Sequence, residues 1–309
     1  MPVILLIVVN VIVPVFILIG AGVLLHRKYH FDLNTLSKIS TNFLMPAVGF
    51  VNIYQSNIEG RVLSGMIGFL VLQNVALMLI SAAAARSLKL ERGLAATFKN
   101  SIVLNNSGNF GLPVSQLVFH NNPLGLSIQV MATIFQTFVT ATYGLLNSVL
   151  VKSTNQGAKI LLELLKLPII YALLLGIILQ TLNVAIPTFL WKPIENVSHA
   201  FIAIALLTLG AQIAYLKITR PSLPLIVGTI GRLVVSPIVA FLIITMLQLE
   251  GTTAQALFIA SSYPASRNTA LFALEYNNHP DYAAQAVLIT TILSCITVTS
   301  IVYISKILF

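Results

Sequence analysis

Residues 102–113 read Ile-Val-Leu-Asn-Asn-Ser-Gly-Asn-Phe-Gly-Leu-Pro, and this stretch is the most informative part of the chain for its fold. It lies in the middle of an apolar run that is otherwise long enough to cross a bilayer. Glycine and proline weaken or break the hydrogen-bond ladder of a helix. In hydrocarbon, the freed N–H and C=O groups must be satisfied by protein or by a water-filled cavity. The stretch therefore predicts a membrane-spanning helix that is interrupted inside the protein.

A second interruption lies far along the chain, where residues 261–268 read Ser-Ser-Tyr-Pro-Ala-Ser-Arg-Asn inside another apolar run. Proline is favoured as the first residue of a helix. Pro264 and Pro113 are therefore each predicted to begin a second half-helix, with Ser262 or Tyr263 as the cap before Pro264. Two interrupted spans at corresponding positions in the two halves of a chain indicate a transport site.

The two interruptions predict a site for an anion. Each second half-helix presents its N-terminus near the midplane, where it carries about half a positive charge and free N–H donors. Arg267 adds a full positive charge, so a carboxylate is the simplest ligand. The residues predicted to bind it are Asn105, Asn106, Ser107, Asn109, Pro113, Pro264, Ser266, Arg267 and Asn268. The alternative is that both stretches are packing kinks joined by polar side chains.

The composition places the chain in a membrane. Of the 309 residues, 57% are apolar and 8% are charged, and the mean hydropathy is +0.95. A soluble domain carries roughly 25% charged residues, so a soluble enzyme is excluded. No phosphate-binding loop and no nucleophile–base pair is evident in the sequence, so we expect no catalytic residue and no cofactor. His26 and His30 are four residues apart but lack further ligands nearby, so no metal site is expected.

Apolar runs of bilayer-spanning length, about 20 residues, recur along the whole chain. We predict an all-α protein with spans at residues 3–25, 33–54, 62–85, 97–120, 124–151, 161–183, 197–216, 222–248, 253–277 and 281–308, which makes ten. The longest connection is expected around Trp191.

The basic residues predict the orientation of the chain. Twelve Lys and Arg residues flank the connections on one side of the predicted spans, and only Arg61, Lys192 and Lys306 fall on the other. The side rich in basic residues is cytoplasmic by the positive-inside rule. This distribution predicts a protein of the cell membrane with both termini outside the cytoplasm. It also explains the net charge of +9 without a nucleic-acid partner.

The chain resembles itself at an offset of about 157 residues. Phe-His-Asn-Asn-Pro at 119–123 aligns with Tyr-Asn-Asn-His-Pro at 276–280, and the alignment pairs the fourth predicted span with the ninth. Residues 1–151 and 152–309 are therefore predicted to be two repeats of five spans. An odd number of spans inverts one repeat relative to the other, which is a transporter architecture. Coincidence between two apolar segments is the alternative.

Several motifs resemble those of the auxin efflux carrier family. Asn-Ser-Gly-Asn-Phe-Gly-Leu-Pro at 106–113 resembles its first crossover motif, and Pro-Ala, Asn and Ala-Leu-Glu-Tyr within 264–276 resemble its second. Further signatures are Pro14-Val15-Phe16 with Gly22 and Arg27, Phe43-Leu44-Met45-Pro46-Ala47, Leu167-Pro168 with Gly176, and Leu209-Gly210-Ala211. Arg267 departs from the family pattern, in which this position is small or polar, so its role as a ligand is inferred from the residue itself.

The resemblance implies ten helices in two inverted five-helix repeats, with helices four and nine discontinuous and crossed. It also implies a fold shared with bile-acid/sodium symporters and an elevator-type mechanism. In that scheme, spans one, two, six and seven form a scaffold that joins two copies in a homodimer, and the other six spans carry the site. Family substrates are small organic anions, including auxin and malate.

A few more polar residues fall inside the predicted spans. Gln129, Gln73 and Glu275 are predicted to line the site or to coordinate a cation. Gln129 is favoured over Gln136 because it aligns with a glutamine of the second repeat. Arg232 either faces a cavity or a partner, or extends to the cytoplasmic interface.

We therefore predict a secondary transporter that moves small organic anions, auxin-like or malate-like carboxylates, by alternating access. Its predicted partners are that anion and membrane lipid. One alternative is a sodium-coupled symporter, in which unwound carbonyls and the amide oxygens of Asn105, Asn109 and Gln129 hold Na⁺. The other alternative is a channel or a membrane receptor.

Overall fold

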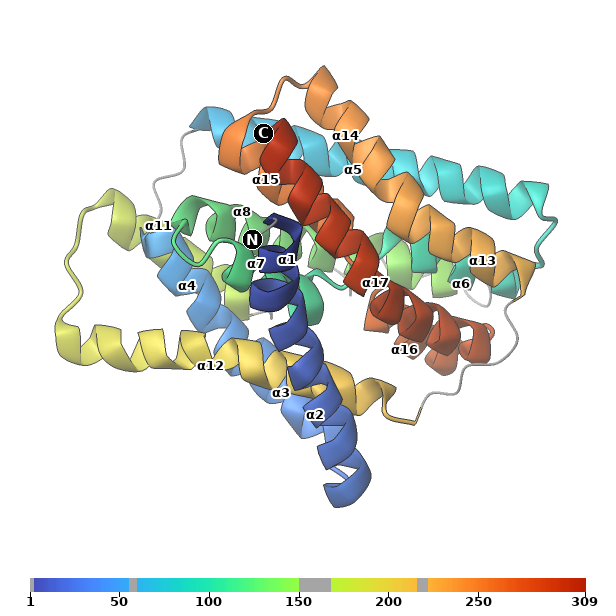
Figure 1. The fold of residues 1–309 in the computed structure, drawn as a ribbon, viewed down its shortest axis with the longest axis horizontal. Helices are drawn as coiled ribbons and strands as arrows, with labels where there is room; N and C mark the ends of the chain where they lie inside the picture. Colours follow the sequence, from blue (N-terminus) through green and yellow to red (C-terminus); the bar gives the residue numbers. More distant parts are fainter. Residues whose placement is uncertain (1–2, 56–59, 150–167, 216–221) are drawn as a thin grey trace.

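The structure is a computed structural model, and it describes residues 3–55, 60–149, 168–215 and 222–309. Regular secondary structure within these residues is helical (Figure 1). The elements before the predicted midpoint are α1 Val3–Ile7, η1 Val8–Ile12, α2 Val13–Tyr29, α3 Leu33–Ile39, η2 Ser40–Leu44, α4 Met45–Gln55, α5 Gly60–Ser87, α6 Arg92–Val103, η3 Ser107–Gly111, α7 Leu112–Val118, α8 Pro123–Val139, η4 Thr140–Gly144 and α9 Leu145–Val149. The elements after it are α11 Pro168–Thr181, α12 Thr188–Ile213, α13 Leu223–Ile230, η5 Gly231–Val235, α14 Ser236–Met246, α15 Gly251–Ser261, α16 Arg267–Tyr276 and α17 Pro280–Leu308.

Six of the described helices are long and apolar enough to cross a membrane. They span Leu5–Tyr29, Val62–Ser87, Pro123–Ser148, Thr188–Ile213, Leu223–Met246 and Pro280–Leu308. The start of the predicted span 161–183 lies outside the described residues. The prediction of an all-helical membrane protein is confirmed at this level, and the division into ten spans stays a prediction.

One connection was predicted wrongly. Trp191 was expected in the longest loop, but it lies in the first turn of α12, which begins at Thr188. Pro187 occupies the N-cap position, and an ion pair of 3.2 Å between Lys192 and Glu195 lies one turn further on. Polar side chains at i and i+3 support a helix, so a polar stretch that reads as a loop continues the apolar helix toward its N-terminus.

Prolines explain most of the irregular turns inside these helices. Four of the five π-helical segments in the described part are followed, two residues later, by a proline: Pro14, Pro46, Pro113 and Pro237. Proline has no N–H, and its ring clashes with the carbonyl four residues earlier. A π turn widens the helix at that point, so the helix continues through the proline and bends instead of ending.

The helices pack in two groups. In Figure 1, α2 and α4 lie with α11 and α12 along the left and bottom of the view, while α5, α13, α14 and α17 lie along the top and right. Helices α2 and α12 touch backbone to backbone, because a Cβ atom built on Gly210 would lie 1.9 Å from the carbonyl oxygen of Ile19. A Cβ atom on Gly22 would likewise lie 2.1 Å from the carbonyl oxygen of Leu207. Only glycine permits this approach, which fixes how α2 and α12 pack against each other.

A capped turn fixes the start of α3, which packs on α12. The side chain of Asp32 accepts hydrogen bonds from the main-chain N–H of Asn34 (3.0 Å) and from the hydroxyl of Thr35 (2.5 Å). The hydrogen bond from Thr35, followed by that from Asn34, lowers the pKa of the Asp32 carboxyl. This cap holds the first turns of α3, on which Ser37 lies.

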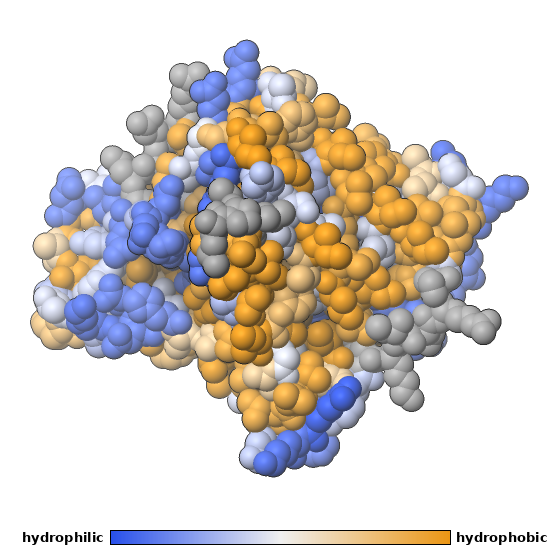
Figure 2. Space-filling view, viewed as in Figure 1, coloured by the Kyte–Doolittle hydropathy of each residue, from blue (hydrophilic) through white to orange (hydrophobic). Residues whose placement is uncertain are grey.

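The outer surface is apolar. Figure 2 shows hydrophobic residues over most of the face formed by α1, α2, α14 and α17, with hydrophilic residues gathered at helix ends such as the lower end of α2. The most exposed apolar side chains include Leu24 of α2, Met246 of α14 and Ile296 of α17. A soluble monomer rarely exposes an apolar surface that extends over several helices. The protein is therefore embedded in lipid as a multi-pass membrane protein.

Candidate functional site

The two interrupted stretches lie against each other. Helix α6 ends at Val103 and α15 ends at Ser261. After each of these two ends, several residues are not helical. In these gaps an antiparallel β-bridge joins Asn105 to Ala265. The bridge links two parts of the chain that are 160 residues apart, so the interruptions form one structure.

Main-chain hydrogen bonds complete this structure. The N–H of Asn106 donates to the carbonyl oxygen of Pro264 (2.9 Å), and the N–H of Ser266 donates to the carbonyl oxygen of Leu104 (2.8 Å). Each interrupted stretch thus satisfies backbone groups of the other. This is what non-helical backbone at membrane depth requires.

The half-helix that follows the second interruption was predicted to begin at Pro264, and that prediction was wrong. Helix α16 begins at Arg267, and Ser266 is its cap, with its hydroxyl accepting a hydrogen bond from the N–H of Asn268 (3.2 Å). The carbonyl oxygen of Pro264 accepts from the other interrupted stretch. Because Pro264 and Ala265 are held in this extended pairing, the helix starts three residues later.

Pro113 does not begin a half-helix either. The helical turns resume at Ser107, with Asn106 as the cap residue, and Pro113 lies buried further along, behind the π turn. Gly111, in that turn, packs on the ring of Tyr263, because a Cβ atom at Gly111 would lie 2.4 Å from a ring carbon. The glycine in the motif therefore allows the two interrupted helices to touch.

The place where the two interrupted stretches meet, residues 104–106 and 262–266, is called the crossing below. A polar cavity of about 170 Å³ lies beside it. Its lining residues are Thr41, Met45, Asn105, Asn106, Ser107, Gly108, Asn109, Thr133, Gln136, Thr137, Thr140, Ile169, Ser266, Arg267 and Asn268. All of the predicted binding residues line it except Pro113 and Pro264. Arg267 is the one charged residue in this lining, and the others are amides, hydroxyls and apolar groups.

Two side-chain atoms at this cavity lack hydrogen-bond partners within the described part of the protein. They are Oδ1 of Asn105, an acceptor, and Nδ2 of Asn106, a donor, and both are buried. Buried polar atoms are nearly always paired, and leaving one unpaired costs about 1–3 kcal/mol. An unpaired acceptor and an unpaired donor therefore belong to two residues that line the same cavity.

Helix α8 and Thr140, the first residue of η4, contribute a polar stripe of which sequence reasoning considered only Gln136 and missed the three threonines. Thr133, Gln136, Thr137 and Thr140 all line the polar cavity. Their spacing of three and four residues puts them on one face of a helix, and this periodicity is the signal that could have found them. Gln129 continues the stripe toward the other side of the crossing.

Three further residues were predicted to line the site or to bind a cation, and they lie in different places. Gln129 lines neither this cavity nor the larger one beside it, and its Oε1 accepts a 3.3 Å hydrogen bond from the hydroxyl of Tyr263. Gln73 lines a small cavity next to Arg232. Glu275 belongs to α16, but its side chain lies outside the described part of the structure.

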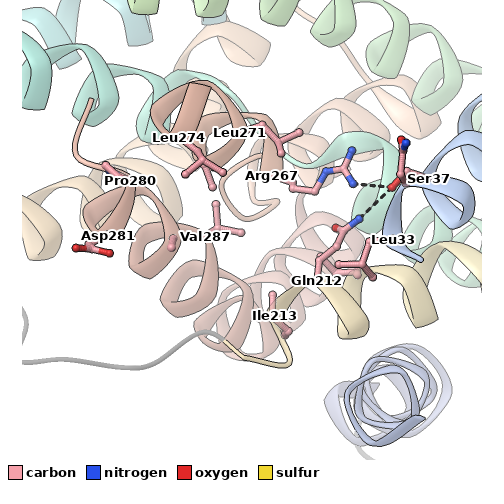
Figure 3. Close-up of a pocket in the computed structure, with 14 residues that line it drawn as sticks. Leu33, Ser37, Gln212, Ile213, Arg267, Leu271, Leu274, Pro280, Asp281 and Val287 are labelled. Carbon is pink, nitrogen blue, oxygen red and sulfur yellow. Dashed lines mark hydrogen bonds between the residues drawn. The ribbon is translucent and has the colours of Figure 1, made fainter. Parts of the chain in front are cut away.

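Arg267 also borders a second, larger cavity of about 530 Å³, shown in Figure 3. This cavity is lined by Leu33, Asn34, Ser37, Leu209, Gln212, Ile213, Arg267, Ala270, Leu271, Leu274, Pro280, Asp281, Ala284 and Val287. The guanidinium Nη1 of Arg267 donates to the hydroxyl of Ser37 (2.7 Å), which also accepts a 3.4 Å hydrogen bond from Gln212. Asp281 lies at the far side of the cavity, beyond Leu274 and Val287 (Figure 3).

The two sides of the crossing differ in exposure within the described part of the protein. Leu271 and Leu274 of the larger cavity are 45% and 68% exposed, and the cavity opens between the starts of α3 and α17. Beyond the crossing, Phe110, Val114 and Tyr263 are fully buried. The side of the crossing that carries the larger cavity is therefore the more exposed one, and the side that carries Phe110, Val114 and Tyr263 is packed.

The described lining offers no metal centre. No group of three or more His, Cys, Asp and Glu residues that could hold a metal ion occurs within the described residues. The free oxygen of Asn105 and nearby main-chain carbonyls are the remaining candidates for cation ligands. Arg267 on the same cavity opposes a cation there.

A helical protein with a lipid-facing surface and a polar cavity between two interrupted helices has the architecture of a membrane transporter. The chain belongs to the membrane transport protein family, the family of the auxin efflux carriers, whose model matches residues 7–302. The family resemblance predicted from the crossover motifs is thereby confirmed.

Two relatives are similar to this chain over much of its length. An uncharacterized transporter of Methanothermobacter thermautotrophicus is 25% identical over 276 residues, which cover 86% of this chain and 87% of the relative. The uncharacterized transporter MJ1031 of Methanocaldococcus jannaschii is 24% identical over 200 residues, covering 63% of this chain and 64% of the relative. The family and these relatives are transporters, not enzymes.

Proposed function

We propose that this protein is a secondary transporter that carries small organic anions across the cell membrane by alternating access. The observation that carries the proposal is the cavity at the crossing, which Arg267 lines together with Asn105 and Asn106, whose side chains each hold an unpartnered atom. These groups supply one positive charge, one free acceptor and one free donor. Ser107, Asn109, Ser266 and Asn268 complete the proposed substrate site.

Electrostatics favours an anion over a cation at this place. The helical turns that begin at Ser107 and at Arg267 both start at the polar cavity. A helix N-terminus carries about half a positive charge and free N–H groups. Arg267 adds a unit charge, which at about 4 Å and an effective dielectric of about 20 is worth about 4 kcal/mol. That energy supports carboxylate binding and opposes a sodium ion in the same cavity.

The larger cavity favours a carboxylate with an apolar body. Its lining is mostly aliphatic, with Leu209, Leu271 and Val287 among the residues, and it meets the polar cavity at Arg267. A carboxylate held at Arg267 would place its apolar part against these side chains. The carboxylate of Asp281, on the same lining, would repel a second negative charge. We therefore favour auxin-like monocarboxylates over malate-like dicarboxylates as substrates.

The packing of the helices supports movement of the site by an elevator-type mechanism. The group α2, α4, α11 and α12 corresponds to the predicted scaffold, and the remaining helices carry the crossing. The proposed repeats, 1–151 and 152–309, have similar local structure where their sequences align. In each, a half-helix ends in a short turn and a proline, Pro123 or Pro280, begins the next helix. In this account the scaffold also forms the homodimer, and both termini face away from the cytoplasm.

Thermal unfolding of the purified protein with small carboxylates tests this proposal. A ligand that binds only the folded state at about 100 times its dissociation constant stabilises it by about 2.7 kcal/mol. Phenylacetate or indole-3-acetate is expected to raise the melting temperature more than malate does, and neutral phenylacetamide is expected to have no effect. Equal stabilisation by phenylacetamide, or none by any carboxylate, would contradict an anion site.

Uptake into proteoliposomes distinguishes the sodium-coupled alternative. Replacing external Na⁺ by K⁺ is expected to leave the rate of carboxylate uptake unchanged. Loss of uptake in K⁺ would instead support a symporter. Orientation is tested separately by attaching a reporter enzyme that is active only in the cytoplasm to each terminus, and neither fusion is expected to be active.

A further inference from the structure

Arg232 is the largest fully buried side chain in the described part of the protein. It lies in η5, the π turn in the middle of the apolar helix Leu223–Met246, and none of it is exposed. Of the two sequence-based alternatives, the structure therefore excludes extension to the interface. An arginine buried at such depth is costly unless its charge is compensated.

The partners of Arg232 are the ends of the two interrupted helices. Its Nη1 donates to the carbonyl oxygen of Ile102 (2.7 Å), and its Nη2 donates to the carbonyl oxygen of Ser261 (2.5 Å). Ile102 lies in the last turn of α6, and Ser261 is the last residue of α15. The last four carbonyls of a helix have no partner within the helix. One guanidinium thus caps the C-termini of both first half-helices.

Hydroxyl groups hold this arrangement together. Nη2 of Arg232 also donates to Oγ of Ser236 (2.5 Å), whose hydroxyl donates to the same carbonyl of Ser261 (2.8 Å). Gln73 donates a longer hydrogen bond of 3.4 Å to Ser236. The described partners of Arg232 are two carbonyls and one hydroxyl, and none of them is a carboxylate.

The charges at this place balance without an acidic residue. Each helix C-terminus carries about half a negative charge, so the two ends together carry about one, which matches the charge of one guanidinium. The N-termini of the second half-helices and Arg267 lie on the substrate side of the crossing. Arg232 neutralises the opposite ends, so a bound anion faces the positive ends alone.

We propose that Arg232 is a positioning residue that acts as a fixed cation. It joins the C-termini of α6 and α15 and cancels their negative charge, so that the transporter needs no bound metal cation there. A cavity of about 10 Å³, lined in part by Arg232, Gln73, Asn105 and Gln136, connects this cluster to residues of the substrate site. That volume is near the minimum for a single water, so no ion of appreciable size fits beside the guanidinium. The contribution of Arg232 to substrate binding rests on the proposed function, whereas its contribution to the stability of the protein does not.

Two substitutions separate charge from hydrogen bonding. Arg232→Lys keeps the charge and offers fewer donors in a fixed direction, while Arg232→Gln keeps N–H donors and removes the charge. Loss of one unit charge at roughly 10 Å, with an effective dielectric of about 20, weakens anion binding on the order of tenfold. The carboxylate affinity is therefore expected to fall about tenfold in Arg232→Gln and much less in Arg232→Lys. Equal affinities in the two variants, or a better affinity in Arg232→Gln, would overturn the proposal.

Rescue by free guanidinium is the decisive test. Arg232→Ala leaves space for a guanidinium ion, so a few millimolar guanidinium chloride is expected to raise its melting temperature in detergent by several degrees. The wild type and Arg27→Ala serve as controls, because Arg27 also donates to a main-chain carbonyl, that of Ala214, but lies away from the crossing. No gain in Arg232→Ala beyond these controls overturns the fixed-cation role. If no carboxylate binds the wild type, the proposed function fails while this stability test still decides the role of Arg232.

If Arg232→Ala does not fold, the ranking of melting temperatures in Arg232→Lys and Arg232→Gln decides the question. The charge-retaining variant is expected to be the more stable of the two. A more stable Arg232→Gln would show that hydrogen bonding alone fixes the crossing, and it would contradict a fixed cation.

Discussion

The main-chain N–H of Asn106 donates a 2.9 Å hydrogen bond to the carbonyl oxygen of Pro264. This bond joins two interruptions that are far apart in the chain, and each supplies the partner that the other needs. Backbone groups that would be costly in lipid are thereby paired, while the side-chain atoms Oδ1 of Asn105 and Nδ2 of Asn106 stay free. The backbone of the crossing is thus satisfied, while two side-chain atoms beside it have no partner in the described part of the protein and are left for the proposed ligand.

Removing the charge of Arg267 should weaken anion binding. Charge-assisted hydrogen bonds contribute about 1.5–3 kcal/mol, so Arg267→Ala is expected to lower carboxylate affinity by about ten- to a hundredfold. The measurement is the dissociation constant in detergent, with Arg267→Lys expected to recover part of the loss. Arg27→Ala is the control, because it removes an arginine bonded to Ala214 and should leave affinity unchanged. Wild-type affinity in Arg267→Ala would show that Arg267 is not the counter-ion.

Replacing the free amides should cost binding without costing stability. Asn106→Leu removes a buried donor that has no partner, so the melting temperature is expected to stay equal or rise. The affinity for a carboxylate is expected to fall at least tenfold. Gln116→Leu is the matched control, since it removes an unpartnered amide oxygen away from both cavities. A marked loss of stability in Asn106→Leu would mean that this amide serves the fold.

The crossing of α2 and α12 depends on glycine. In Gly210→Ala the new Cβ meets the carbonyl oxygen of Ile19 at 1.9 Å, which should force the helices apart and lower the free energy of unfolding by about 1–3 kcal/mol. Gly20→Ala is the control, because nothing lies within 4 Å of its Cβ position. That change should be neutral or stabilising by up to about 1 kcal/mol. Thermal unfolding in detergent compares them, and equal melting temperatures would refute the close packing of the two helices.

Accessibility should follow the side on which the site is open. Cys295 is the single cysteine of the chain, so Cys295→Ser gives a background for new thiols. In it, Leu271→Cys at the larger cavity is expected to react quickly with a membrane-impermeant maleimide added from the cytoplasmic side. Ser115→Cys, beyond the crossing and fully buried, should react slowly, and only from the opposite side during transport. Equal rates at both positions from one side would indicate a continuous pore.

Much of the fold could be predicted from the sequence because its signals are local. Apolar length gave the lipid-facing helices, and Gly, Pro and Asn gave the two interruptions. The start of α16 could not be predicted, because Pro264 and Ala265 are held extended by hydrogen bonds and a bridge to a distant segment. A proline signal within one helix carries no information about such a partner.

The sequence also could not predict how far along a helix, relative to the cavity, a polar residue lies. Gln129 and Gln136 are seven residues apart and lie on one face of α8, so periodicity cannot choose between them. The structure places Gln136 on the polar cavity and Gln129 against Tyr263. Arg232 posed a similar choice, and its partners, Ile102 and Ser261, lie on two other helices.

Counterflow of a labelled carboxylate in proteoliposomes distinguishes a carrier whose site is at Arg267 from a channel or a receptor. Vesicles are loaded with the unlabelled monocarboxylate that raised the melting temperature most, and entry of labelled compound is followed from outside. A carrier is expected to accumulate label transiently in vesicles with the wild-type protein, and to show a much smaller overshoot with Arg267→Ala. Entry that only equilibrates and never overshoots, or an undiminished overshoot in Arg267→Ala, would contradict a carrier whose site is the crossing at Arg267.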